Sequence, residues 1–272
     1  MRSPAALRLL FCHGLGCAGG EAQLAAQWAR QKAIQFQMVE YAHYGDPSHV
    51  WAVDSWVRDI AAELTRGERT AAAAADASPR ATARPRRQRT IAACVSAGAQ
   101  ALLRALWHSP PLAQHLAGLL LLSPAVGMEL PNYVHKVLPD RWDALRAGLP
   151  VDHPSADRTV RLRVSMDSLL DYEKNCILRR DTSPPALNFP IRIVHGLHDK
   201  LVPVANGVEL LRQLPSPDKA MHVVPCGHVI TDTSTVVNAL DCILAQICRE
   251  EDNAPQQMAT ARNAKVPEAI LR

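Results

Sequence analysis

Apolar positions along the chain follow two alternating spacings. Short continuous apolar runs, typical of buried strands, occur at residues 7–12, 36–41, 90–95, 116–124, 190–196 and 219–225. Between them lie segments whose apolar residues recur at helical spacing, at residues 21–33, 50–64, 97–107, 204–214 and 233–250. Strands that alternate with helices predict an α/β fold, in which a mostly parallel, doubly wound sheet carries helices on both faces.

Three segments depart from this rhythm. Residues 67–89 are rich in Ala, Arg and Pro and are predicted to form a disordered surface insert. Residues 125–185 are divided by several prolines into short pieces, which predicts a small helical cap over the strand ends. Residues 251–272 are polar and are predicted to be a flexible tail. We therefore predict a single α/β domain over residues 1–250.

The formal net charge of +4 does not indicate a nucleic-acid-binding protein. Residues 66–89 alone contain seven arginines against Glu68 and Asp76, so the rest of the chain carries a formal charge of −1. No aromatic residues are interleaved with these arginines, as a stacking surface for nucleic acid would require. Nucleic acid is therefore not an expected partner, and the composition does not predict an oligomeric state.

Apolar stretches and cysteines restrict the compartment. The longest apolar stretch, residues 116–128, is shorter than the roughly 18 residues of a membrane span, so no transmembrane segment is expected. The apolar opening runs directly into a His-Gly turn and is predicted to be a core strand rather than a cleaved signal. The seven cysteines are an odd number without C-x-x-C spacing, which favours a reducing compartment and indicates neither a disulfide framework nor a zinc site.

Residues with catalytic potential follow three of the predicted strands. Ser96 follows the third strand, Asp199 the fifth and His228 the sixth. The carboxyl ends of parallel strands share one edge of a sheet, so these residues are expected to meet there. A serine, an acid and a histidine in this chain order are typical of α/β-hydrolases.

The stretch IAACVSAGAQ, residues 91–100, is close to a nucleophile elbow, the G-x-S-x-G turn between a strand and a helix. Cys94 replaces its first glycine, whereas Gly98 supplies the second. Cysteine is small enough to pack between strand and helix, so we predict a usable elbow rather than an ordinary turn. The turn HGLG, residues 13–16, has a flexible backbone whose amide can face a developing oxyanion.

Together these motifs resemble the serine α/β-hydrolase superfamily over roughly residues 7–248. Within it, SLLDYEKNCILRRDTSPPALNFPIRIVHGLHDKLVP (168–203) and YAHYGDPS (41–48) resemble the branch of alpha/beta-hydrolase domain-containing protein ten. That branch is mitochondrial and hydrolyses palmitoyl-protein thioesters and acyl glucuronides. The resemblance implies a mitochondrial location, with the cytoplasm as the alternative. It also implies strands ahead of residue 7, so a reduced sheet or an incomplete gene product is expected.

The resemblance implies a role for each candidate residue. Ser96 would be the nucleophile, His228 its general base and Asp199 the acid that orients the imidazole. The backbone amides of Leu15 and Ala97 would form the oxyanion hole. No metal and no cofactor is expected.

The function predicted on this basis is a serine hydrolase of the palmitoyl-protein thioesterase type, which cleaves acyl thioesters or esters through an acyl-enzyme intermediate. Its partner would be an acylated protein or a small-molecule ester. Two alternatives stay open: a small-molecule carboxylesterase, including an acyl-glucuronide esterase, and a non-catalytic binding protein with this fold. Six apolar residues of the cap are predicted to line an acyl-chain groove: Met128, Leu130, Tyr133, Val134, Val137 and Leu138.

Overall fold

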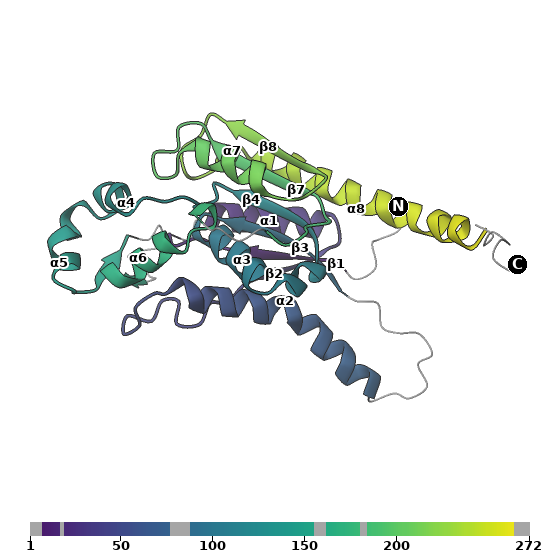
Figure 1. Ribbon diagram of the computed structural model, residues 1–272, viewed down its shortest axis with the longest axis horizontal. Coiled ribbons are helices and arrows are strands. Elements are labelled where there is room, and N and C mark those ends of the chain that lie inside the picture. The colour runs from purple at the N-terminus through teal and green to yellow at the C-terminus, as the bar shows by residue number, and fades with distance from the viewer. Residues whose placement is uncertain (1–6, 17–18, 77–87, 155–161, 180–183, 264–272) are drawn as a thin grey trace, which may run out of the picture.

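The protein folds around a six-stranded parallel sheet (Figure 1). The structure, a computed structural model, describes residues 7–16, 19–76, 88–154, 162–179 and 184–263. In spatial order the strands are β2 (Gln35–Met38), β1 (Leu7–Cys12), β3 (Arg89–Val95), β4 (Leu116–Leu122), β7 (Ile191–Gly196) and β8 (Lys219–Val224). The doubly wound α/β prediction is confirmed, and each strand begins and ends within three residues of its predicted bounds.

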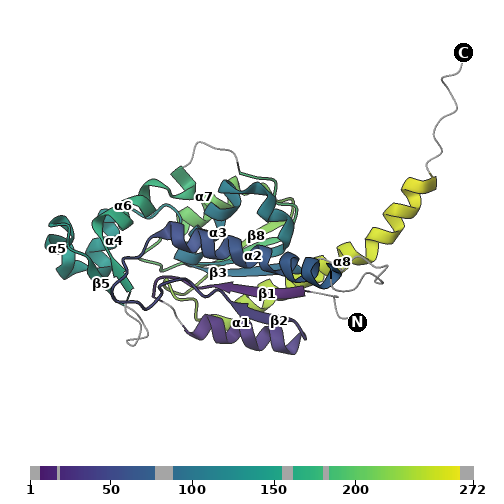
Figure 2. The same cartoon turned by 90° about the horizontal axis from the view of Figure 1, so that it is seen from below.

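Helices cover both faces of this sheet. The flanking helices are α1 (Gly19–Gln31), α2 (Val53–Asp76), α3 (Ala97–His108), α7 (Val204–Gln213) and α8 (Thr233–Asn263). Figure 2 shows α1 on one side of the sheet and α2 and α3 on the other. Trp28 of α1 and Ile243 of α8 belong to one buried apolar cluster, whereas Trp56 of α2, Leu102 of α3 and Leu210 of α7 belong to the other.

Strands β1, β4 and β7 are buried along their whole length because helices cover them on both faces. This explains why their sequences read as continuous apolar runs rather than as alternating patterns. Arg8 of β1 is an exception, and its Nη1 lies 3.0 Å from Oε1 of Glu63 in α2. Its Nε also donates to Oγ1 of Thr90 in β3, at 3.0 Å. The buried guanidinium therefore has the partners that its burial requires.

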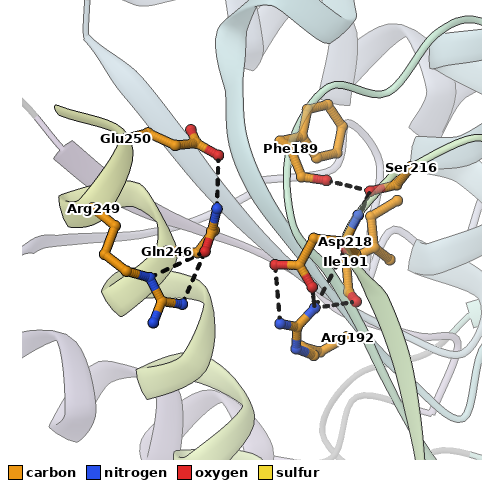
Figure 3. A network of polar contacts seen from close by, with 8 residues as sticks. All are labelled: Phe189, Ile191, Arg192, Ser216, Asp218, Gln246, Arg249 and Glu250. Atoms are coloured by element: carbon orange, nitrogen blue, oxygen red, sulfur yellow. Dashed lines mark hydrogen bonds and ion pairs between the residues drawn. The ribbon is translucent and has the colours of Figure 1, made fainter. Parts of the chain in front are cut away.

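The amino-terminal ends of β7 and β8 are joined by a second polar network (Figure 3). The Arg192 guanidinium makes two contacts with the Asp218 carboxylate, at 2.8 and 3.1 Å. Ser216 Oγ donates to the carbonyl oxygen of Phe189 at 2.7 Å. On α8, Arg249 and Glu250 both contact Gln246. The contacts of Arg192 and Ser216 join the amino-terminal ends of β7 and β8, whereas those of Gln246 lie within α8.

A cap lies at the other end of the sheet, as predicted for residues 125–185 (Figures 1 and 2). It contains α4 (Leu130–Val137), α5 (Trp142–Arg146), β5 (Val151–His153), β6 (Leu162–Val164) and α6 (Met166–Lys174), with 3₁₀ turns at Pro139–Arg141 and Ile177–Arg179. The cap is mostly helical, as predicted, but β5 and β6 add an antiparallel pair that the sequence does not predict. Three-residue strands are too short for an alternating pattern to reveal them.

Two segments predicted to lack structure are partly helical. Helix α2 continues to Asp76 and β3 begins at Arg89. The prediction of disorder over residues 67–89 is therefore wrong for both ends of that segment. Residues 77–87 lie outside the described residues. Five consecutive alanines (71–75) have the highest helix propensity, and they extend a helix that is already nucleated.

Helix α8 likewise continues across Pro255 to Asn263, which corrects the flexible tail predicted from residue 251, and residues 264–272 lie outside the described part.

The cysteines among the described residues are all free: Cys12, Cys94, Cys176, Cys226, Cys242 and Cys248. None of the described helices combines the length and the apolarity that crossing a bilayer requires.

Candidate active site

The structure brings together the three side chains predicted to form a catalytic triad. Ser96 follows β3, Asp199 follows β7 and His228 follows β8, and each residue lies at the carboxyl end of its strand. The Oγ atom of Ser96 is 2.9 Å from Nε2 of His228. The Nδ1 atom of His228 is 2.8 Å from Oδ2 of Asp199. A hydroxyl, an imidazole and a carboxylate therefore form one continuous chain of hydrogen bonds.

The direction of these hydrogen bonds follows from the carboxylate. An ionised Asp199 can only accept, so Nδ1 of His228 carries the proton that is donated to it. In a neutral imidazole Nε2 is then left with a lone pair, and it accepts a hydrogen bond from the Ser96 hydroxyl. This is the tautomer in which a histidine can remove the proton of a serine.

The Asp199 carboxylate is held in its ionised form. Its side chain is fully buried, and burial acts to raise its pKa. Hydrogen bonds from His195 and His228 and from the Val202 backbone amide outweigh burial and lower the pKa of Asp199 below its ordinary value. The Oδ1 atom accepts from the backbone amides of Leu201 and Val202 at 2.8 and 2.9 Å. The acid therefore remains charged and fixed throughout the physiological pH range.

Ser96 occupies a strained backbone conformation, with φ of 49° and ψ of −116°. Such a conformation costs about 1–3 kcal/mol and persists only where the surroundings impose it. Here the Ser96 amide donates to the Leu122 carbonyl at 3.0 Å, and the Ser96 carbonyl accepts from the Ala125 amide at 3.1 Å. The end of β4 thus fixes the serine from both sides, as a nucleophile elbow requires.

Of the two glycine positions in the elbow motif, only that of Gly98 requires a residue without a side chain. A Cβ atom at Gly98 would lie 2.4 Å from the carbonyl oxygen of His13 and 2.5 Å from that of Cys12. Helix α3 therefore leaves β3 against the backbone of β1, which leaves no room for a side chain. Cys94, at the position of the missing glycine, is fully buried and pairs in register with Cys12 of β1. Its side chain fits between strand and helix, as expected from its size.

Leu15 and Ala97, whose amides are predicted to form the oxyanion hole, both lie beside Ser96. Ala97 is the first residue of α3, so its amide has no acceptor within the helix. Leu15 follows Gly14, where a Cβ atom would lie 2.9 Å from Cβ of Ser96. Leu15, Ala97, Ser96 and His228 line one small recess of about 30 Å³. An oxyanion hole formed by the amides of Leu15 and Ala97 stays a prediction that this arrangement permits.

A larger cavity of about 240 Å³ opens beside Ser96 and His228 under the cap. Tyr133 and Val137 of α4 line it, and Met128 lines the adjoining recess. The other three residues predicted for an acyl groove do not line either space: Leu130, Val134 and Leu138. Leu130 and Val134 are four residues apart on another face of α4, and Leu138 directly follows the helix. All three are buried in the apolar core.

Three polar residues near the triad were not predicted. Glu21 of α1 and His153 of β5 line the larger cavity, and the Tyr133 hydroxyl is hydrogen-bonded to Nε2 of His153. His195 is fully buried, with Nε2 3.5 Å from Oδ2 of Asp199. Glu21 does not stand out in the sequence, because an acid in the first turn of a helix usually only interacts favourably with the helix dipole. His153 does not stand out either, because a single histidine forms no recognisable spacing pattern. Of the three, only His195 belongs to a recognisable motif in the sequence, the His-Gly pair that precedes Asp199.

The loops that carry Asp199 and His228 are packed tightly against each other. The His198 amide donates to the Cys226 carbonyl at 2.9 Å. A Cβ atom at Gly196 would lie 2.0 Å from the carbonyl oxygen of Gly227. Glycine at position 196 is therefore required for the histidine loop to reach the acid. Among the described residues, no group of three or more histidine, cysteine or acidic side chains could hold a metal ion.

Comparison with known proteins identifies the fold. No family model and no curated protein matches the sequence. Among solved structures, a soluble variant of monoglyceride lipase from Saccharomyces cerevisiae is similar, with a TM-score of 0.69 and 15% identity over 89% of this chain and 87% of that one. Mouse alpha/beta hydrolase domain-containing protein 10 has a TM-score of 0.63 and 16% identity, over 91% and 92%. Est1E from Butyrivibrio proteoclasticus with bound ferulic acid has a TM-score of 0.60 and 15% identity, over 90% of each chain.

These similarities establish that the chain has the α/β-hydrolase fold. Because its likeness to several hydrolases is comparable, the narrower resemblance to the branch of domain-containing protein ten stays a prediction.

Proposed function

We propose that the protein is a serine hydrolase that cleaves carboxylic esters through an acyl-enzyme intermediate. The observation that carries the proposal is the hydrogen-bonded chain from Ser96 through His228 to Asp199, with the serine on a strained elbow. Similar solved structures include a monoglyceride lipase and the esterase-type protein Est1E, which agrees with ester hydrolysis. A non-catalytic binding protein has no need to hold His228 2.9 Å from the serine.

The proposed reaction has two steps, and in each of them His228 first accepts a proton and then donates it. In the first, Ser96 Oγ attacks the ester carbonyl carbon while His228 Nε2 takes the hydroxyl proton. The amides of Leu15 and Ala97 stabilise the negative oxygen of the tetrahedral intermediate. The bond to the departing oxygen breaks, and that oxygen receives the proton from His228. In the second step water attacks the acyl-enzyme in the same way and releases a carboxylic acid and free Ser96.

Replacing Ser96 with Ala tests this proposal. The variant should lose at least about 10³-fold in kcat, because the nucleophile is removed, while its unfolding midpoint should stay close to that of the wild type. The measurements are hydrolysis of p-nitrophenyl acetate and labelling by a fluorophosphonate probe. Ser109, a serine outside the site, provides the matched control Ser109→Ala, which should be labelled like the wild type. Undiminished labelling of Ser96→Ala would rule out Ser96 as the nucleophile.

The same residues could serve two narrower functions. The resemblance to the branch of domain-containing protein ten favours a palmitoyl-protein thioesterase, since a triad of this kind also accepts thioesters. The cavity favours the second candidate, a small-molecule carboxylesterase. Its volume of about 240 Å³ lies below the roughly 300–1,000 Å³ of typical ligand pockets, and half of the predicted acyl-groove residues are buried elsewhere.

A chain-length series separates these candidates. For a small-molecule carboxylesterase, kcat/KM for p-nitrophenyl esters should be highest with short acyl groups and fall by at least about tenfold towards palmitate, because a long chain exceeds the cavity. A palmitoyl thioesterase should show the opposite trend, both with these esters and with acyl-coenzyme A thioesters. A steady rise in kcat/KM towards palmitate would therefore reject the carboxylesterase.

A further inference from the structure

The cavity beside the triad contains a carboxyl group for which the proposed reaction has no use. Glu21, in the first turn of α1, lines this cavity together with Ser96, His228 and Val229. Only 5% of the Glu21 residue is exposed. Burial raises the pKa of Glu21, although its own backbone amide, that of Ile230 and the nearby His228 act in the opposite direction. Because burying a carboxyl group is unfavourable, the position of Glu21 beside the triad calls for an explanation.

One oxygen of Glu21 has spare capacity to accept a hydrogen bond. Its Oε2 atom has no hydrogen-bond partner within the described part of the chain. A buried acceptor without a partner is unfavourable, and such groups in folded proteins call for an explanation. Tyr133 and His153, the polar pair on the cap side, are already hydrogen-bonded to each other. Glu21 is thus well suited to accept a hydrogen bond from a bound molecule.

The position of Glu21 indicates which half of a substrate it would meet. His228 has to hand its proton to the departing oxygen, so the departing group lies on the His228 side of Ser96. Glu21, His228 and Val229 line the same cavity. His228 is close enough to Glu21 to act on the pKa of that carboxyl group, which it lowers. Val229 is 52% exposed, so this part of the cavity leads to solvent. A departing alcohol would therefore have Glu21 beside it.

We propose that Glu21 is a specificity-determining residue, which selects esters whose departing alcohol carries a hydroxyl group. The inference rests on the proposed esterase function and narrows its substrate class. The alcohol's hydroxyl donates a hydrogen bond to the Glu21 carboxyl group while the ester carbonyl faces Ser96. In its ionised form Glu21 also disfavours departing groups that carry a carboxylate of their own, and this weighs against an acyl-glucuronide substrate.

A matched pair of substrates tests the proposal without any mutation. In 2-hydroxyethyl butanoate the terminal methyl group of propyl butanoate is replaced by a hydroxyl, at almost the same size. The wild type should hydrolyse the hydroxyethyl ester with kcat/KM at least about tenfold higher. The ester 2-carboxyethyl butanoate should be the poorest of the three. Release of butanoate is followed by titration at pH 8, so that no chromophore alters the departing group.

Two variants assign this preference to Glu21. Glu21→Leu removes the acceptor and should bring the ratio of the two kcat/KM values close to one, with the propyl ester still hydrolysed. Glu21→Gln keeps the shape and one acceptor oxygen, so it should retain part of the preference and improve hydrolysis of the carboxyethyl ester. Glu40→Gln, at an exposed acid after β2, removes a charge elsewhere and should leave all ratios unchanged.

The outcomes separate this inference from the proposed function. Equal rates with the hydroxyethyl and propyl esters, in a protein whose Ser96 is labelled by fluorophosphonate, overturn the role of Glu21 and leave the esterase intact. A preference that persists in Glu21→Leu also overturns it, because another group then recognises the hydroxyl. Absence of both hydrolysis and labelling in the wild type removes the proposed function, and this inference with it.

Discussion

At the scale of single residues, Asp199 has the environment that most distinguishes the site from an ordinary turn. It is a buried carboxylate whose oxygens receive hydrogen bonds from two backbone amides and from His228. A surface acid that merely caps a turn has no need of a buried imidazole such as His195 on its other side. The cost of burying this charge is offset only because both oxygens have partners. The arrangement therefore stabilises both the fold and the imidazole tautomer.

Replacing Asp199 with Asn should lower kcat by about 10³–10⁴-fold, because an amide that donates to Nδ1 favours the wrong tautomer of His228. The variant should also be less stable at pH 7, by about 1–3 kcal/mol. Since the pKa of Asp199 is lowered in the folded protein, its contribution to stability is present above the unfolded value of about 3.9 and is lost as the pH falls below it.

Urea unfolding of the wild type and Asp199→Asn at pH 7 and pH 3 measures this contribution. The difference in unfolding free energy should be smaller at pH 3 than at pH 7. Asn188→Asp, which adds an acid at a position outside the site, controls for a general effect of charge on acid stability. A difference that grows towards acid would contradict the lowered pKa.

At the scale of elements, α3 and the end of β1 approach each other closely in the site. The Gly98 position allows α3 to rest on the carbonyl groups of Cys12 and His13. The ring of His13 packs at right angles to Tyr41 and Trp56, with centroid distances of 4.6 and 5.4 Å. The start of the predicted oxyanion turn is thus fixed by a helix on one side and an aromatic cluster on the other. Its shape depends on that helix remaining close.

Gly98→Ala should destabilise the protein by about 1–3 kcal/mol, because the added Cβ atom must displace backbone atoms rather than a flexible side chain. It should also lower kcat more than KM changes, since the turn that carries Leu15 moves with His13. Cys94→Gly restores the missing glycine of the elbow and is the matched control, with activity expected to remain within a few-fold of the wild type. Urea unfolding and steady-state kinetics measure both effects, and wild-type activity in Gly98→Ala would contradict this account.

The same scale shows where prediction from the sequence reaches its limit. Strands that are buried on both faces, such as residues 7–12, have an unbroken apolar sequence and were predicted with their correct bounds. The β5–β6 pair is not predicted by the sequence, because each of its strands has only three residues, too few for an alternating pattern. The extension of α2 was missed because a run of alanines has high helix propensity but no apolar periodicity.

At the scale of the whole molecule, the meeting of the triad could be predicted because it depends on topology alone. Parallel strands place their carboxyl ends on one edge, so the order of the strands is enough to predict that Ser96, Asp199 and His228 lie together. The wall of the cavity could not be predicted in this way. Glu21 and His153 come from α1 and from the cap, and their positions depend on how helices and cap settle on the sheet.

The mutual packing of the Asp199 and His228 loops has a consequence for how the protein can diversify. Their contacts run between β7 and β8 and their following turns. Among the described residues, no backbone–backbone hydrogen bond joins these two loops to the cap, although the Lys136 ammonium group of α4 donates to the Lys200 carbonyl. Proton transfer thus depends on loops that are separate from the cap, which lines one wall of the cavity. A cap from another protein with this fold could therefore replace the present one and change which substrates reach Ser96, while the hydrogen bonds of the triad stay the same.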